Sequence, residues 1–303
     1  MEIVRALQAF ASPTLNEIMF TITNLGSERA YIVFILIAYL GINARVGQQL
    51  GIALTASFYL NFLLKGLIDT PRPYLIDESV NLGERYTATG LGPGFPSGHA
   101  QGSATFWGLA AARVRTPLFW AITALIVLLI SLSRIYFGLH LPIDVVGGVI
   151  IGAGIVLITL GVVRWRERVA LSHLLIVGLG IAVPFALHIV MPLISNTFVF
   201  NESDLLLGGL AAFITGPTLL RHQAGGTWWQ RVTLVLLGIV LVFAFLIGSS
   251  LLLPEAIKRN PVGGFVRYLT LGYVGVLLTP WLGRHFGIAL KPDLEPDQPR
   301  AAT

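Results

Sequence analysis

Three short polar clusters interrupt an otherwise apolar chain. They run over Lys65–Pro73, Pro96–His99 and Ser133–Asp144, and they contain cations, histidines and carboxylates. Charged groups at membrane depth are expensive and usually functional. These clusters are therefore the candidates for chemistry.

Three cations, Lys65, Arg72 and Arg134, indicate a site for a multiply charged anion. Lys65 and Arg72 are about two helical turns apart, so we expect one helix face to present both. Pro71 and Pro73 should end that helix and hold Arg72 in an extended backbone. Phosphate is the anion that fits best, because guanidinium groups bind its oxygens in pairs.

Ser97, Gly98 and His99 stand where a polar loop, 69–98, meets an apolar stretch. Free backbone N–H groups at a helix start bind anions, and a glycine allows close approach. We expect Ser97 to cap this helix and to donate to a phosphate oxygen.

His140 and Asp144 are one helical turn apart, and Pro142 between them suits the first turn of a helix. A carboxylate that accepts from one imidazole nitrogen fixes the tautomer and leaves the other nitrogen free to attack. The pair therefore resembles an activated nucleophile, and His99 is a second histidine that could act as general acid.

Other interpretations of these residues are weaker. Two histidines and an aspartate could hold a metal ion, but three neighbouring cations would repel it, so no metal site is expected. Each cation alone could be an interfacial anchor, yet their grouping argues against this. His173 and His188 are expected to serve packing or hydrogen bonding.

Composition shows which elements must position these residues. Only 12% of the 303 residues are charged, 55% are hydrophobic, and the mean hydropathy is +0.78. Soluble domains carry roughly 25% charged residues, so we predict an all-α, polytopic membrane helix bundle. The sequence contains no cysteine, which excludes thiolate and disulfide chemistry. The net charge of +5 is first a topology signal, and no nucleic-acid partner is expected.

About nine apolar stretches are each roughly long enough for a bilayer core of ~30 Å, although short ones could be tilted or re-entrant. They lie at 29–44, 46–66, 99–114, 117–137, 142–163, 169–192, 205–220, 232–253 and 265–283. We accordingly divide the chain into N-terminal interfacial helices over 1–28, a helical core over 29–165, a C-terminal membrane module over 166–290 and a disordered tail over 291–303.

The C-terminal module contains an internal repeat. Arg168-Val-Ala-Leu recurs as Arg231-Val-Thr-Leu, and at the same offset Gly209 matches Gly272. We expect two helix hairpins in the same orientation. This module is also the candidate surface for homo-oligomers.

Alternating spans divide the charges between two faces. Under the positive-inside rule the almost purely basic face is cytoplasmic, and all three polar clusters fall on the other, mixed-charge face. The basic face collects Arg45, Arg113, Arg115, Arg164, Arg166, Arg168, Arg221, Arg231, Arg284 and Lys291.

The pattern Lys-x6-Arg-Pro, Pro-Ser-Gly-His and Ser-Arg-x5-His-x3-Asp resembles that of the type 2 phosphatidic acid phosphatase superfamily. All three motifs are complete, and the resemblance covers roughly 29–163. It implies that His140 attacks phosphorus, that Asp144 orients it, and that His99 protonates the leaving group, with no cofactor or metal. It also implies that the phosphoryl oxygens are bound by Lys65, Arg72, Ser97, Gly98 and Arg134.

The favoured function is a metal-independent phosphatase of a cell membrane, acting on a lipid phosphate or pyrophosphate at the extracytoplasmic face. Candidate substrates include undecaprenyl pyrophosphate and phosphatidic acid. A phosphotransferase would use the same site with a lipid or sugar acceptor. The repeated helices also allow a lipid transporter, and a haloperoxidase would share the anion pocket.

Overall fold

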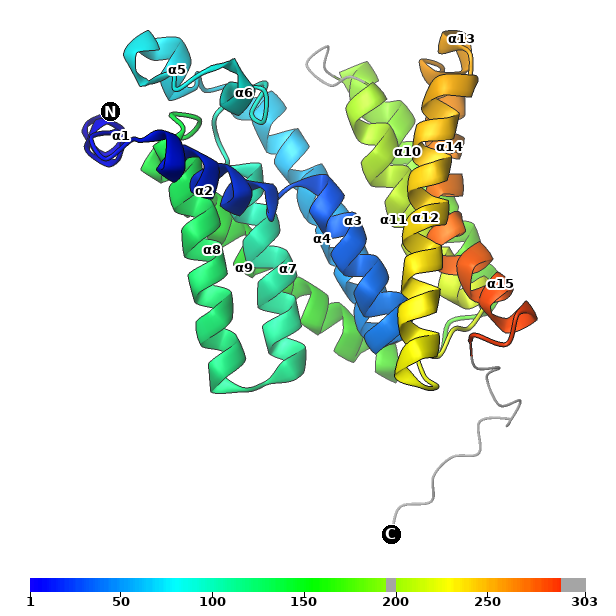
Figure 1. The fold of residues 1–303 in the computed structure, drawn as a ribbon. Helices are drawn as coiled ribbons and strands as arrows, with labels where there is room; N and C mark the ends of the chain where they lie inside the picture. Colours follow the sequence, from blue (N-terminus) through cyan, green and yellow to red (C-terminus); the bar gives the residue numbers. More distant parts are fainter. Residues whose placement is uncertain (195–199, 290–303) are drawn as a thin grey trace.

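The computed structural model describes residues 1–194 and 200–289, and within them every regular element is a helix, which confirms the predicted class. Figure 1 shows the long helices side by side, with successive helices running in opposite directions. They are α4 (Ala44–Ile68), α7 (Gly98–Val114), α8 (Pro117–Tyr136), α9 (Pro142–Arg168), α10 (His173–Ile194), α11 (Phe200–Leu219), α12 (Trp228–Leu252) and α14 (Pro261–Tyr273). The expected tail over 291–303 lies outside the described residues.

Shorter helices complete the two ends of the bundle. They are α1 (Glu2–Gln8), α2 (Pro13–Asn24), α3 (Glu28–Leu36) with the π-helical η1 (Ile37–Ile42), α5 (Pro73–Ile76), η2 (Glu78–Val80), α6 (Glu84–Thr87), α13 (Glu255–Lys258), η3 (Val274–Leu278) and α15 (Thr279–His285). Pro13 is the first residue of α2.

Within residues 1–194 and 200–289, six helical segments are long and apolar enough to cross a membrane, and α2 with α3 and η1 would make a seventh across a bend of 51°. The expected count of about nine is therefore approximate. The stretches expected at 99–114 and 205–220 are helical, but the whole of α7 has 17 residues, and the apolar part of α11 is Ser203–Leu219. Several apolar helices in one chain make this a multi-pass membrane protein.

The core that supports the polar clusters joins α3, α4, α7 and α9. Tyr31, Leu50 and Leu109 are buried in it together with Val156. α7 and α9 pack unusually closely, because a Cβ at Gly152 would lie 2.5 Å from the backbone oxygen of Gln101. This contact fixes the start of α9 against the start of α7.

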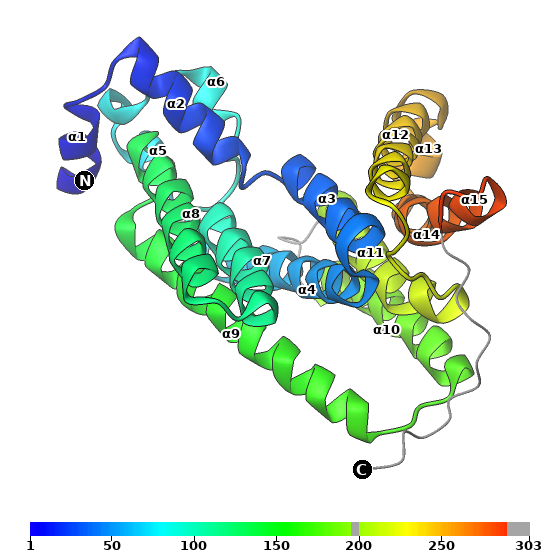
Figure 2. The same ribbon diagram turned by 60° about the horizontal axis from the view of Figure 1, so that its bottom comes forward.

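The helices from α10 to α15 lie to one side of α3 and α4 (Figure 2). The repeat forms two hairpins, and its glycines meet where α11 crosses α14, because a Cβ at Gly272 would lie 3.9 Å from the Cα of Gly209. His188 joins three of these helices, with Nδ1 2.8 Å from Ser203 Oγ and Nε2 2.9 Å from the backbone oxygen of Pro261. It therefore has the hydrogen-bonding role expected for it. The proposed division into four regions stays a prediction.

Candidate active site

The three polar clusters meet at one end of the bundle. They come from the end of α4, the start of α7 and the connection between α8 and α9, which lie together in Figure 1. The backbone N–H of Ser97 donates to the backbone oxygen of Asp144 at 2.9 Å, which ties the second cluster to the third. Helix starts and ends thus converge from segments that are far apart in the sequence.

Arg72 lies at the centre of the site and is 3% exposed. Its backbone is extended (φ −81°, ψ 153°), as its flanking prolines predicted. α4 ends at Ile68, however, so the expectation that Lys65 and Arg72 share one helix face is wrong. The left-handed Asp69 turns the chain out of the helix before Arg72 is reached.

The Arg72 guanidinium group contacts the candidate nucleophile. Its Nη1 lies 3.1 Å from His140 Nε2 and 3.0 Å from the backbone oxygen of Leu139. Nε and Nη2 donate to the backbone oxygens of Gly92 and Leu91 at 2.8 and 2.9 Å. Because a guanidinium group can only donate, Nε2 of His140 must be the acceptor, and the ring proton must be on Nδ1.

Asp144 lies on the Nδ1 side of the same ring. Its Oδ2 accepts from the backbone N–H of Leu141 at 2.8 Å and is 3.6 Å from His140 Nδ1. The second distance is longer than a hydrogen bond, so the pair is aligned without being bonded. Burial lowers the pKa of His140 well below its usual value, and the charges of Arg72 and Arg134 lower it further. The ring is therefore neutral, and the unprotonated electron pair is on Nε2.

Arg134 is held from two other segments and is 1% exposed. Nη1 donates to the hydroxyls of Thr23 at 3.0 Å and Thr89 at 2.9 Å, and Nη2 donates to the backbone oxygen of Thr89 at 3.0 Å. Neither threonine belongs to the three polar clusters, and neither was expected from the sequence. Thr23 belongs to α2, so an N-terminal helix contributes directly to the site.

Ser97 is at the N-cap position of α7, but its side chain makes no capping bond, which corrects that expectation. The hydroxyl is fully buried and has no hydrogen-bond partner among the described residues. Buried hydroxyls are normally paired, so this one is available to a ligand. Gly98 follows it, and a Cβ there would lie 3.2 Å from Asn61 Oδ1.

Asn61 begins a hydrogen-bond network that supports the loop before α7. Its Nδ2 donates to the backbone oxygen of Pro96 at 3.2 Å and to Gln101 Oε1 at 2.8 Å. Gln101 Nε2 in turn donates to the backbone oxygen of Ser57 at 2.6 Å. Amides spaced along apolar helices were the signal that could have indicated this network.

Lys65 and His99 line a cavity of about 570 Å³. Lys65 Nζ donates to the backbone oxygens of Pro93 and Gly94. His99 is half-buried, in the first turn of α7. The lining also includes Leu206 and Tyr268, which belong to the C-terminal module. Among the described residues, no three His, Cys, Asp or Glu side chains are grouped closely enough to hold a metal ion.

Comparisons with known proteins match both halves of the chain. A family model described as PAP2 superfamily matches residues 47–168, and one described as PAP2 superfamily phosphatase, transmembrane extension, matches residues 200–291. The glucose-6-phosphatase catalytic subunit 1 of Haplochromis nubilus is 30% identical over 119 residues, covering 31% of this chain and 34% of that protein. Sphingosine-1-phosphate phosphatase 2 of Mus musculus is 29% identical over 141 residues, covering 45% and 39%.

The crystal structure of Aquifex aeolicus LpxE is also similar, with a TM-score of 0.47 and 25% sequence identity, covering 53% of this chain and 93% of that chain. The chain spans between 28% and 50% of the length of the curated relatives it matches.

Proposed function

Because the chain belongs to the PAP2 superfamily, whose domain and transmembrane extension together match more than half of it, we propose that it hydrolyses a lipid phosphate or pyrophosphate through a phosphohistidine. The main support for this proposal is the orientation of the His140 ring. Its Nε2 is 3.1 Å from Arg72 Nη1, and its Nδ1 faces the carboxylate of Asp144. This geometry supports an imidazole with its electron pair directed at the place where a guanidinium group would hold a phosphoryl oxygen.

The reaction proceeds in two steps. His140 Nε2 attacks phosphorus, the bond to the lipid oxygen breaks, and His99 donates a proton to that oxygen. Water then attacks phosphorus with His99 as the base, the P–N bond breaks, and inorganic phosphate leaves. The ring of His140 becomes cationic while it carries the phosphoryl group, and the carboxylate of Asp144 stabilises that charge.

The phosphoryl group carries its own charge, which the cations offset. Lys65, Arg72 and Arg134 supply positive charge, and Ser97 Oγ with the backbone N–H of Gly98 supplies neutral donors. Donors that are already in place when charge develops in a buried site are worth far more than donors in water. No step requires a metal ion.

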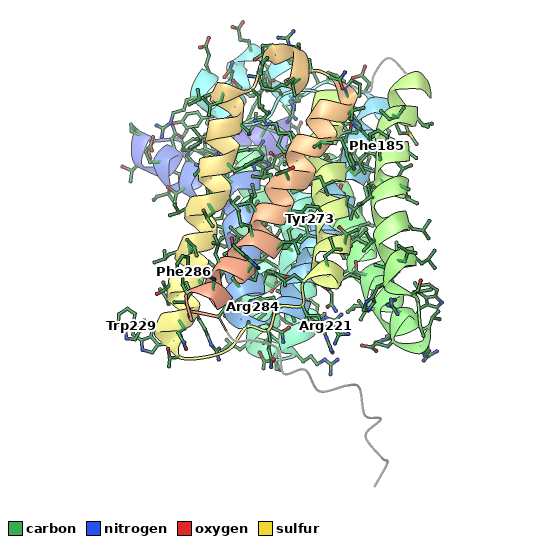
Figure 3. The ribbon with its side chains drawn as sticks, turned by 90° about the vertical axis from the view of Figure 1, so that its right-hand side faces the viewer. Phe185, Arg221, Trp229, Tyr273, Arg284 and Phe286 are labelled. Atoms are coloured by element: carbon green, nitrogen blue, oxygen red, sulfur yellow. The ribbon has the colours of Figure 1, made fainter. Side chains whose placement is uncertain are left out.

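We assign the site to the extracytoplasmic side of a cell membrane. The opposite end of the bundle collects arginines from several helices, as the positive-inside rule requires of a cytoplasmic face. Arg221 and Arg284 lie toward that end of the C-terminal module, and Trp229 lies at the same end (Figure 3). The end with the site carries both signs of charge, for example in the ion pair of Arg5 with Asp77.

The test is release of inorganic phosphate by the purified protein in detergent with EDTA. The substrates are undecaprenyl pyrophosphate, phosphatidic acid and glucose-6-phosphate. We expect at least one lipid to be hydrolysed and His140→Ala to abolish that activity. His173→Ala is the matched control, because His173 is exposed at the start of α10. Undiminished phosphate release by His140→Ala would overturn the proposal.

A further inference from the structure

A second, apolar cavity of about 110 Å³ adjoins the cavity that Lys65 and His99 line. The two share lining residues, among them Phe58, Leu206 and Tyr268. They are therefore neighbouring spaces, one with a polar lining beside Lys65 and His99 and the other apolar. His99, which protonates the leaving group in the proposed function, lines the polar part.

The apolar cavity extends from the site toward the middle of the bundle. Along α4 the lining runs from Lys65 in the polar part to Leu54 in the apolar part. These positions are eleven residues apart, or about 16 Å at 1.5 Å per residue. The space therefore follows the helix axes away from the end of the bundle where the site lies, and reaches well into the hydrocarbon region.

Its walls belong to two different parts of the chain. α3 and α4 of the core form one wall, and α11 with α14 and η3 of the C-terminal module form the other. These helices lie side by side in Figure 2. Gly209 and Gly272, the pair related by the internal repeat, both line the cavity. At Gly209 there is room for a side chain, whereas a Cβ at Gly272 would clash with the Cβ of Ala212.

We propose that this cavity holds an apolar chain of the substrate while its phosphate occupies the site, so that the C-terminal module selects substrates by their chain. The inference rests on the proposed function. The shared lining identifies the occupant, since a chain attached to a phosphate beside His99 has the apolar cavity next to it. A sugar phosphate would leave the apolar part empty.

The cavity acts by its shape and not through a gain in hydrophobic free energy. Lipid tails are already in an apolar medium, so moving one from the bilayer into protein gains little transfer free energy. What the cavity provides is a defined path that brings the phosphate to His140 in one orientation. Blocking that path should therefore reduce the reaction of long-chain substrates selectively.

Gly209→Leu is the blocking variant. A Cβ at Gly209 would meet only Thr55 Cγ2, at 3.5 Å, which is ordinary contact, so the larger side chain can be accommodated by entering the cavity. Gly178→Leu is the matched control, because Gly178 in α10 is exposed and has nothing within 4 Å of an added Cβ. Both variants make the same change in helix propensity.

The measurement is kcat/KM for long-chain phosphatidic acid and for p-nitrophenyl phosphate, which has no chain. For Gly209→Leu we expect the ratio of the two constants to fall about tenfold or more, since misfit by a methylene or more in a pocket costs that much. Gly178→Leu should keep the wild-type ratio. An unchanged ratio in Gly209→Leu overturns the inference, while hydrolysis of both substrates would still support the proposed function. If the wild type hydrolyses neither of these substrates nor undecaprenyl pyrophosphate, the proposed function is refuted, and the inference with it.

A second measurement tests the inference if Gly209→Leu loses activity toward both substrates. Phosphatidic acid with a diazirine near the end of its chain is photolysed with His140→Ala, which leaves the lipid intact. Labels within 205–213 and 268–276 support the inference. Labels confined to faces outside the cavity, such as exposed Val240 of α12, overturn it.

Discussion

Asp144→Asn should cost less activity than Asp144→Ala, although both remove the same charge. One oxygen, Oδ2, accepts from the backbone N–H of Leu141 at 2.8 Å and faces His140 Nδ1 at 3.6 Å. An asparagine at this position must place its carbonyl oxygen there, because the Leu141 N–H requires an acceptor. An acceptor therefore still faces Nδ1, and the reactive tautomer of His140 is preserved.

The loss in Asp144→Asn is then the loss of charge alone. At 3.6 Å and an effective dielectric constant of about 20, a carboxylate stabilises a cationic imidazole ring by about 4–5 kcal/mol. The dipole of the amide recovers part of this, so we expect kcat to fall by about 10²–10³. Asp144→Ala also leaves the Leu141 N–H without its acceptor and removes the group that faces Nδ1, so its loss should be about tenfold or more larger than that of Asp144→Asn.

The assay is single-turnover release of inorganic phosphate with rapid quenching. Asp77→Asn is the control, because Asp77 lies at the same end of the bundle and pairs with Arg5. Equal losses in Asp144→Asn and Asp144→Ala would refute the argument that the oxygen stays in place. Wild-type rates in Asp144→Asn would show that its charge is not used.

Three further predictions follow from the contacts of the site. Ser97→Ala removes a buried hydroxyl without a partner among the described residues, so the free energy of unfolding should change by less than about 1 kcal/mol, while kcat/KM falls about tenfold or more. Thermal denaturation measures the first quantity and phosphate release the second. A large loss of stability would contradict the assignment of this hydroxyl to the ligand. Thr23→Val removes a partner of Arg134 and should lower kcat/KM about tenfold, with recovery in Thr23→Ser, whereas equal losses in both variants would point to packing instead. Because the pKa of His140 is lowered from its usual 6.5, the ring stays neutral as the pH falls through 6.5, and the acid limb of kcat/KM, corrected for substrate ionisation, should lie below pH 6.5; a limb above that value would contradict a buried nucleophile.

The convergence of the clusters could be predicted because it depends on chain direction. Alternating apolar helices return to the same face, so Arg72, Ser97 and His140 had to lie at one end once their helices were recognised. The extended backbone at Arg72 followed from its two prolines. The assignment of catalytic roles to these residues stays a prediction.

The partners of these residues could not be predicted in the same way. Thr23 reaches Arg134 across 111 residues, and no local pattern distinguishes it from other threonines near helix ends. The missing cap at Ser97 depends on how the preceding loop is held by Asn61. The apolar cavity depends on the packing of α11 against α4 and α14, which periodicity alone does not determine.

The cations of the resting site are already occupied by the protein's own backbone. Arg72 binds the carbonyl oxygens of Leu91, Gly92 and Leu139, and Lys65 binds that of Pro93. An arriving phosphate competes with these oxygens for the N–H groups that they occupy, so each bond that it takes over contributes to affinity only by the difference between the old and the new bond. The same exchange runs backwards after the reaction, when the loop carbonyls reclaim their donors and help inorganic phosphate to leave. Such internal competition would limit the inhibition of a strongly cationic pocket by its product, inorganic phosphate.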